Sequence, residues 1–206
     1  MKIWGNRTQG NPVRVAIFLA EKGIDVPFEP VDLFAGAHKS SDYLAKNPTA
    51  QVPVLELDDG TCISETVAIC RYFERICPEP PLMGVGPVGE ALVDMWQRRI
   101  EFQFYDAARH AFRHSAPFMQ ILEPVQIAEW AALNRAKLLE ALDMMDAQLK
   151  DNRFIAGADF TVADITAILP FQILGLLEIK LPDHVRAVAR WHEEVSARPS
   201  VASVIG

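Results

Sequence analysis

The 206-residue sequence lacks an excess of positive charge, since 20 lysines and arginines stand against 27 aspartates and glutamates, for a formal net charge of -7. Binding to nucleic-acid phosphates requires a basic surface, so this balance argues against a nucleic-acid partner. The sequence also lacks an apolar run long enough to cross a membrane, and its first residues lack the apolar stretch of a signal peptide. We therefore expect a cytoplasmic protein with no membrane partner.

Cysteine is scarce, which limits the disulfide and metal chemistry open to the chain. Cys62, Cys70 and Cys77 are odd in number and lack the spacing of a disulfide framework or a zinc ribbon. A reducing compartment such as the cytoplasm fits this pattern. His110 and His114 stand at i and i+4, a spacing that can chelate a metal, but no third ligand is evident and we predict no metal.

Prolines cluster between residues 78 and 87, where PEPPLMGVGP contains four prolines in ten residues. Such a segment cannot continue a helix or a strand. We therefore predict a linker at 81–87, between a first domain at 1–80 and a second domain at 88–206.

The first domain alternates strand and helix patterns. Residues 2–4 have the composition of a strand, and Asn11-Pro12 is typical of a helix start because Asn is a favoured N-cap and Pro is favoured at the next position. Gly23 is a natural helix stop, and residues 28–33 have the pattern of a second strand. Strand, helix and strand at this spacing predict a parallel βαβ unit.

A hairpin and a second helix complete this domain. Residues 52–57 and 61–64 form two short strand patterns around the turn signal Asp59-Gly60. We expect Ser64 to be the N-cap of the helix that follows.

The chain beyond residue 88 contains only helical patterns, which we place over 90–112, 125–149 and 186–196. Thr161 and Asp164 have the spacing of a capping box that opens a further, buried helix. The predicted fold class is therefore an α/β domain followed by an all-α domain.

Two features of the segment 51–66 exceed what folding requires. Pro53 lies in a strand-like run, where its missing N–H indicates an edge position or a cis bond. Glu65-Thr66 opens a helix whose free N–H groups can hold a carboxylate. The pairing of Val52-Pro53 with Glu65-Thr66 resembles the glutathione site of the cytosolic glutathione S-transferases, in particular bacterial members with a phi- or theta-like site.

This resemblance implies a thioredoxin-like βαβ-ββα domain, an all-helical C-terminal domain, and glutathione as co-substrate. Glu65 would bind the γ-glutamyl ammonium, and Thr66 the γ-glutamyl carboxylate. The backbone of Val52 would pair with the cysteinyl part of glutathione, as an added strand does. Further glutathione-binding residues implied by the resemblance are Gln51, Pro53, His38 and Lys39, the last two at the glycyl carboxylate.

A transferase must present glutathione as a thiolate, and the loop after the first strand would have to favour it. The family's usual residues are Tyr, Ser or Cys, and none stands between Gly5 and Pro12. The missing Cys argues against the chemistry of the Cys-dependent classes. Asn11 is the first choice of sulfur donor because its amide has two N–H groups, followed by Thr8 and then Gln9.

The resemblance also implies that the electrophile lies in a cleft between the two domains. Phe102, Tyr105, Arg109 and Phe112 are candidate substrate-binding residues, although packing in the core or in a dimer explains them equally well. The expected activity is conjugation of glutathione to small electrophiles, or hydroperoxide reduction, in detoxification by a homodimer. The alternatives are a glutathione-dependent isomerase or dehalogenase, and a non-catalytic interaction protein that kept the fold.

Overall fold

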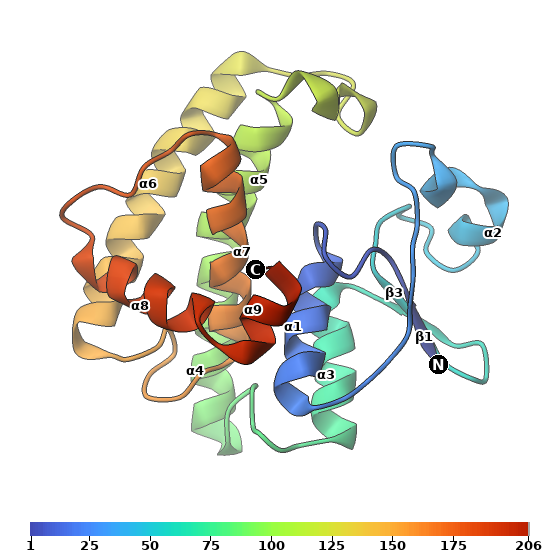
Figure 1. Ribbon diagram of the computed structural model, residues 1–206, viewed down its shortest axis with the longest axis horizontal. Helices are drawn as coiled ribbons and strands as arrows, with labels where there is room; N and C mark the ends of the chain where they lie inside the picture. The colour runs from blue at the N-terminus through green and yellow to red at the C-terminus, as the bar shows by residue number, and fades with distance from the viewer. Residues whose placement is uncertain (206) are drawn as a thin grey trace. The chain divides into compact units, whose positions relative to one another are not determined.

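The computed structural model describes residues 1–205, and these form two compact units. The first unit contains residues 1–82 together with helix α9 (Pro199–Ile205), and the second contains residues 83–198 (Figure 1). The boundary between them lies inside the proline-rich segment 78–87.

A four-stranded sheet in the described part of the first unit has the strand order β2-β1-β3-β4. Strands β1 and β2 are parallel, as the predicted βαβ unit requires, and Ile3 pairs with Phe28. Strands β1 and β3 are antiparallel, and so are β3 and β4 of the hairpin. The strand bounds are β1 (Lys2–Trp4), β2 (Phe28–Glu29), β3 (Val54–Glu56) and β4 (Cys62–Ser64).

Strand β2 is much shorter than the predicted 28–33. Pro30 follows its last residue and has no N–H for a ladder hydrogen bond. Two residues later, Asp32 Oδ1 accepts hydrogen bonds from the backbone N–H groups of Phe34 and Ala35 at 3.0 and 2.9 Å. This side-chain turn bends the chain away from the sheet.

Two helices of the first unit, α1 (Pro12–Lys22) and α3 (Thr66–Ile76), lie side by side, on the side of the strands away from α2 (Ser41–Leu44) (Figure 1). Helix α1 stops as predicted, because Gly23 adopts the left-handed conformation at φ 66°. Ser64, however, is not the cap of α3. It is the last residue of β4, where it pairs with Val54, and the N-cap position belongs to Glu65.

Lys22 joins the ends of α1 and α3 with a fully buried side chain. Its Nζ lies 2.7 Å from Glu74 Oε2 and donates to the carbonyl oxygens of Cys77 and Pro80 at 2.8 and 2.7 Å. An ammonium group has three donors, so these partners use all of them. A buried charge with matched partners is costly to disturb, which makes Lys22 a structural residue of this unit.

Helix α9 was not predicted, because the last helical pattern was placed over 186–196. Pro199 opens α9, where its missing N–H breaks no helical hydrogen bond. The helix packs against α1, with Val201 fully buried, and Ser200 Oγ donates to Glu21 Oε2 at 2.5 Å. Residues 199–205 therefore belong to the first unit, not to the helical domain of 88–206 that the sequence analysis expected.

The second unit is helical, and the α/β plus all-α fold class is confirmed. The predicted helix 90–112 is observed as three consecutive pieces, with a π-helical segment, η2, in the middle. None of the helices described over residues 1–205 is long and apolar enough to cross a membrane. The elements are α4 (Gly86–Arg99), η2 (Ile100–Tyr105), α5 (Asp106–Arg113), η3 (Pro117–Ile121), α6 (Ala128–Asp151), α7 (Val162–Leu176) and α8 (Arg186–Ser196).

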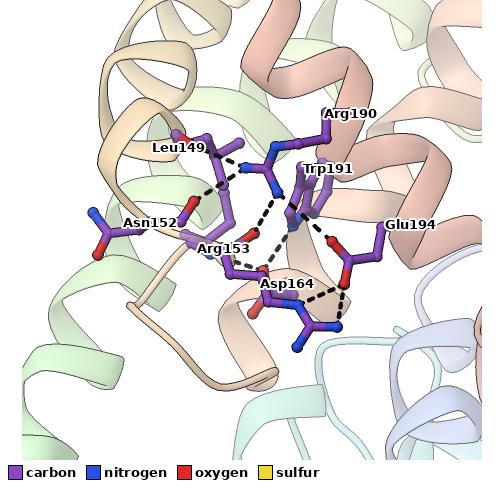
Figure 2. Close-up of polar contacts among 8 residues, drawn as sticks. Leu149, Asn152, Arg153, Asp164, Arg190, Trp191 and Glu194 are labelled. Carbon is purple, nitrogen blue, oxygen red and sulfur yellow. Dashed lines mark hydrogen bonds and ion pairs between the residues drawn. The ribbon is translucent and has the colours of Figure 1, made fainter.

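The predicted capping box at the start of α7 is confirmed. Its Asp164 also belongs to a buried cluster that includes Trp191 (Figure 2). Asp164 Oδ2 accepts from the backbone N–H and the hydroxyl of Thr161 at 3.0 and 3.2 Å. Asp164 Oδ1 accepts from the Ile155 N–H at 2.9 Å and from Trp191 Nε1 at 2.8 Å. Complete burial nevertheless raises the pKa of this carboxyl to about 6.

Arg190 and Arg153 connect the end of α6 with α8 beside this cluster (Figure 2). Arg190 donates to the carbonyl oxygens of Leu149, Asn152 and Arg153 at 3.0 to 3.3 Å. Arg153 pairs with Glu194 at 2.6 Å. These contacts and the capping box are part of the folding of the second unit.

Candidate functional site

The turn before β3 contains the predicted cis bond between Val52 and Pro53, which is confirmed. The preceding carbonyl, that of Gln51, accepts hydrogen bonds from Tyr43 Oη at 2.8 Å and from Asn47 Nδ2 at 2.9 Å. Tyr43 and Asn47 are buried, while Gln51 is exposed and Val52 is half-buried. The segment around α2 therefore fixes the backbone where the chain enters the cis bond.

The start of α3 combines an exposed carboxylate with a buried hydroxyl. Glu65 is exposed and has φ 67° and ψ 119°, a conformation that a residue with a side chain rarely adopts. Such strain costs about 1–3 kcal/mol and often occurs at functional sites. Thr66 follows as the first residue of the helix and is 7% exposed.

Arg14 contacts this helix start and was missed by the sequence analysis. Its Nη1 donates to Thr66 Oγ1 at 2.5 Å, and the arginine is only 4% exposed. The signal was present in the sequence, because Arg14 interrupts the apolar run Val13–Leu19 of the predicted helix. A charged residue is almost never fully buried without a partner, so an arginine in such a run indicates one.

Gly5 brings the loop after β1 close to the cis bond. It has φ 145°, and a Cβ added there would lie 2.7 Å from Pro12 Cγ and 3.6 Å from the Pro53 Cα. Its N–H donates to the Glu29 carbonyl at 2.8 Å. Glycine is therefore required where the loop, the start of α1 and the turn at Pro53 meet.

The three candidate sulfur donors of this loop have different environments. Thr8 and Gln9 are exposed, and the Thr8 hydroxyl donates to Asn6 Oδ1 at 3.2 Å. Asn11 is half-buried and occupies the N-cap position of α1, as predicted, but its side chain forms no capping hydrogen bond within residues 1–205. The capping role expected of that side chain is therefore wrong.

His38 and Lys39 lie in the short 3-10 helix η1 (Ala37–Lys39), and only the histidine is buried. Burial, together with the nearby Lys39 charge, lowers the pKa of His38, so its ring is neutral at pH 7. Within the described chain, its buried Nδ1 has no hydrogen-bond partner. Lys39 is exposed and supplies the cationic group of this segment.

The four candidate electrophile residues belong to one helical stretch of the second unit. Phe102 is 58% exposed on η2, and Tyr105 is half-buried at the end of η2. Arg109 pairs with Asp106 at 3.0 Å on α5. Phe112 packs edge-to-face on Phe118, with ring centroids 5.6 Å apart.

The stretch also contains His110 and His114, whose rings stack with centroids 6.0 Å apart. The pKa of His110 is lowered by burial and by the adjacent Arg109 charge. Over the described range 1–205, no group of three or more His, Cys, Asp and Glu side chains has an arrangement that could hold a metal ion.

Comparisons with known proteins agree with this architecture over both units. The family model described as "Glutathione S-transferase, N-terminal domain" matches residues 1–75, and that described as "Glutathione S-transferase, C-terminal domain" matches residues 110–199. Among curated proteins, Glutathione S-transferase 2 of Saccharomyces cerevisiae is 34% identical over 197 residues, which cover 94% of this chain and 84% of the relative.

Relatives from other kingdoms match over nearly the full chain. Glutathione S-transferase 3 of Zea mays is 31% identical, with coverage of 100% of this chain and 93% of the relative. A crystal structure of a glutathione S-transferase domain-containing protein from Marinobacter aquaeolei VT8 superposes with a TM-score of 0.93 at 38% identity, covering 98% of this chain and 100% of that one. The predicted resemblance and enzyme class are thus confirmed: the chain belongs to the glutathione S-transferase family.

Proposed function

We propose that this enzyme activates the thiol of glutathione as a thiolate and transfers it to small electrophilic carbon centres, or uses it to reduce hydroperoxides. The observation that carries the proposal is the start of α3, where the buried Thr66 hydroxyl follows the strained, exposed Glu65. Strained backbone at an exposed helix start fits a ligand site better than a purely structural one.

The γ-glutamyl end of glutathione would bind at this helix start. The free N–H groups of the first turn and the Thr66 hydroxyl suit its carboxylate, and the Glu65 carboxylate suits its ammonium group. The backbone of Val52, fixed by the hydrogen bonds to the Gln51 carbonyl and adjacent to Pro53, would pair with the cysteinyl part.

The glycyl carboxylate would lie at η1. Lys39 supplies a positive charge there, while His38, neutral at pH 7, would act as a hydrogen-bond donor and not as a cation. The unpartnered Nδ1 of His38 within the described chain supports a ligand-binding role for this ring.

The sulfur would lie at the loop between β1 and α1, with Asn11 as its side-chain donor. The Thr8 hydroxyl already donates its proton to Asn6 Oδ1, which makes Thr8 the weaker candidate. Lowering the thiol pKa by two units requires about 3 kcal/mol of preference for the thiolate. The positive end of the α1 dipole contributes about 0.3–1 kcal/mol of this, so a directed N–H donor must supply the rest.

The electrophile would contact the exposed ring of Phe102 and the neighbouring side chains of Tyr105, Arg109 and Phe112. Aromatic side chains suit apolar electrophiles, and an arginine suits a substrate with an anionic group. We further propose a cytoplasmic homodimer that serves in detoxification. The free thiols of Cys62, Cys70 and Cys77 agree with a reducing compartment, and light scattering at micromolar concentration tests the dimer.

Calorimetric titration with glutathione tests the proposal. Replacing Thr66 by Ala should weaken binding by about 1–3 kcal/mol, the usual loss when a hydrogen bond to a charged group is removed. Thr61→Ala is the matched control, because it makes the same chemical change at an exposed turn of the hairpin and should leave affinity unchanged. Unchanged affinity in folded Thr66→Ala would rule out this glutathione site.

An activity panel then identifies the reaction. Glutathione should be supplied with aryl halides, isothiocyanates, hydroperoxides and disulfides in turn. Conjugation or peroxide reduction supports the proposal. Binding without turnover of any of these would favour an interaction protein that kept the site.

A further inference from the structure

Arg14 places a charge between two helices of the first unit, directly behind the proposed carboxylate site. We propose that Arg14 is a positioning residue that orients the Thr66 hydroxyl as a donor and makes the enzyme selective for the γ-glutamyl carboxylate. This inference rests on the proposed function, because it assigns a further residue to the same glutathione site. It goes beyond that function because it predicts that Arg14 variants lose the preference for ligands with a γ-glutamyl carboxylate.

The direction of the Arg14–Thr66 hydrogen bond carries the inference. A guanidinium group contains only donors, so the bond of 2.5 Å has Arg14 Nη1 as donor and Thr66 Oγ1 as acceptor. A hydroxyl has a single proton and rotates to suit its partners. With Arg14 on its oxygen, the Thr66 O–H is directed to another acceptor, which is the role that a carboxylate at the helix start requires.

Burial strengthens this effect. Arg14 and Thr66 are 4% and 7% exposed, so water screens the bond only weakly. The guanidinium polarises the hydroxyl and places a positive charge one hydrogen bond behind the anion site. The planar group also fixes the geometry in a way that a lysine ammonium, a mobile point charge, does not.

Lys22 provides an internal comparison, because it is a second buried cation that also extends from α1 to α3. Its three donors serve Glu74 Oε2 and the carbonyl oxygens of Cys77 and Pro80, at the far end of the helix pair. Lys22 therefore stabilises the unit without facing the start of α3. A variant of Lys22 should reduce stability and leave ligand selectivity unchanged.

The experiment compares two ligands by calorimetry. One is glutathione, and the other is 4-aminobutyryl-cysteinyl-glycine, which keeps the ammonium group but lacks the γ-glutamyl carboxylate. The folded parent should bind glutathione at least about tenfold more tightly than this analogue. Arg14→Met should weaken the binding of glutathione but not of the analogue, and so abolish most of the difference in affinity. Arg14→Lys should retain part of this difference. In the Thr66→Val background, Arg14→Lys should change the ratio no further.

Three outcomes overturn the inference. If Arg14→Lys weakens the binding of both ligands equally, Arg14 has a purely structural role. The control Lys22→Met should lower the melting temperature and leave the binding ratio of the two ligands unchanged. If Arg14→Lys lowers the ratio of the two affinities as much in the Thr66→Val background as in the parent, Arg14 does not act through Thr66. If the parent binds glutathione normally and Arg14→Lys leaves the selectivity unchanged, the positioning role of Arg14 is rejected. The proposed function is not affected by that result.

A parent protein that binds neither ligand would reject the proposed function itself, and the role of Arg14 with it. If Arg14→Met does not fold, Arg14→Lys and Thr66→Val still provide the comparison, because both keep the volume of the site close to that of the parent. The melting temperature of each variant identifies the folded ones before titration.

Discussion

The side-chain amide of Asn47 donates to the carbonyl oxygen of Gln51 at 2.9 Å, while its own oxygen accepts from the backbone N–H and hydroxyl of Thr49 at 3.2 and 2.9 Å. Asn47 is only 2% exposed, so this small turn is organised around a buried amide. Ala50, inside the turn, has φ 55°, a conformation that needs such support. The turn leads directly into the cis bond of the proposed glutathione site.

Replacing Asn47 by Ala should therefore affect both stability and binding. The change leaves the Thr49 groups without their acceptor, and we expect a loss of about 1–3 kcal/mol in unfolding free energy, with weaker glutathione binding. Urea denaturation and calorimetry measure the two effects. Tyr43→Phe is the comparison, because it removes the other hydrogen bond to the same carbonyl and leaves the turn intact. A stability change in Asn47→Ala no larger than that in Tyr43→Phe would contradict the central role of the amide.

Local sequence signals predicted much of this architecture. Two correct predictions are the capping box of Thr161 and Asp164 and the helix stop at Gly23. Both depend only on neighbours within a few residues, so the local sequence is enough to predict them. The shortness of β2 could also have been read from Pro30, which the prediction of a strand over 28–33 overlooked.

Contacts between distant segments escaped the sequence analysis. Arg14 meets Thr66 across 52 residues, and Lys22 meets the Pro80 carbonyl across 58. No local pattern specifies these partners, because tertiary packing of α1 on α3 brings them together. The conformation of Glu65 was missed for a similar reason, since its positive φ follows from how β4 joins α3 and not from its own preference.

Replacing Gly5 by Ala should destabilise the first unit strongly. The new Cβ would lie 2.7 Å from Pro12 Cγ and would also occupy a φ of 145°. Strain and overpacking each cost about 1–3 kcal/mol. Gly36→Ala is the matched control, because Gly36 has φ 78° but no heavy atom within 4 Å of an added Cβ in the described chain. Thermal unfolding should show the larger loss for Gly5→Ala, and equal losses would argue against the close approach at Pro12.

The stability of the protein should depend on pH through Asp164. Burial raises the pKa of this carboxyl from its usual value of 3.8 to about 6 in the folded state. The folded protein therefore binds the proton more tightly than the unfolded chain does. The resulting stabilisation is present below about pH 4 and is lost as the pH rises through 6. At 1.36 kcal/mol per pKa unit it amounts to about 3 kcal/mol.

Urea unfolding of the parent and of Asp164→Asn between pH 4.5 and 7, about the window of this titration, measures the effect. The asparagine cannot titrate, so the stability of the parent relative to the variant should fall across this window. A constant difference would mean that Asp164 keeps its ordinary pKa. A difference that grows with pH would mean that its four hydrogen bonds outweigh burial and lower the pKa.

Asn11 provides the most direct test of thiol activation. We expect bound glutathione to show a thiolate absorbance that titrates below the free thiol, because an N–H donor and the start of α1 favour the anion. Asn11→Ala should raise that pKa and slow conjugation about tenfold or more, the scale of one hydrogen bond to a charged group. Glutathione affinity should change much less, because the γ-glutamyl and glycyl contacts remain.

The Thr8→Ala and Gln9→Ala variants separate the candidates in the same titration. The Thr8 hydroxyl already donates its proton to Asn6 Oδ1, so Thr8→Ala should leave the pKa of the bound thiol near the parent value. If Asn11→Ala leaves the titration unchanged while either of the other variants shifts it, the sulfur donor is that other residue. If bound glutathione titrates like free glutathione in the parent, then no loop residue activates the thiol. The proposed glutathione site would in that case serve binding alone, since affinity at the γ-glutamyl end does not require an ionised sulfur.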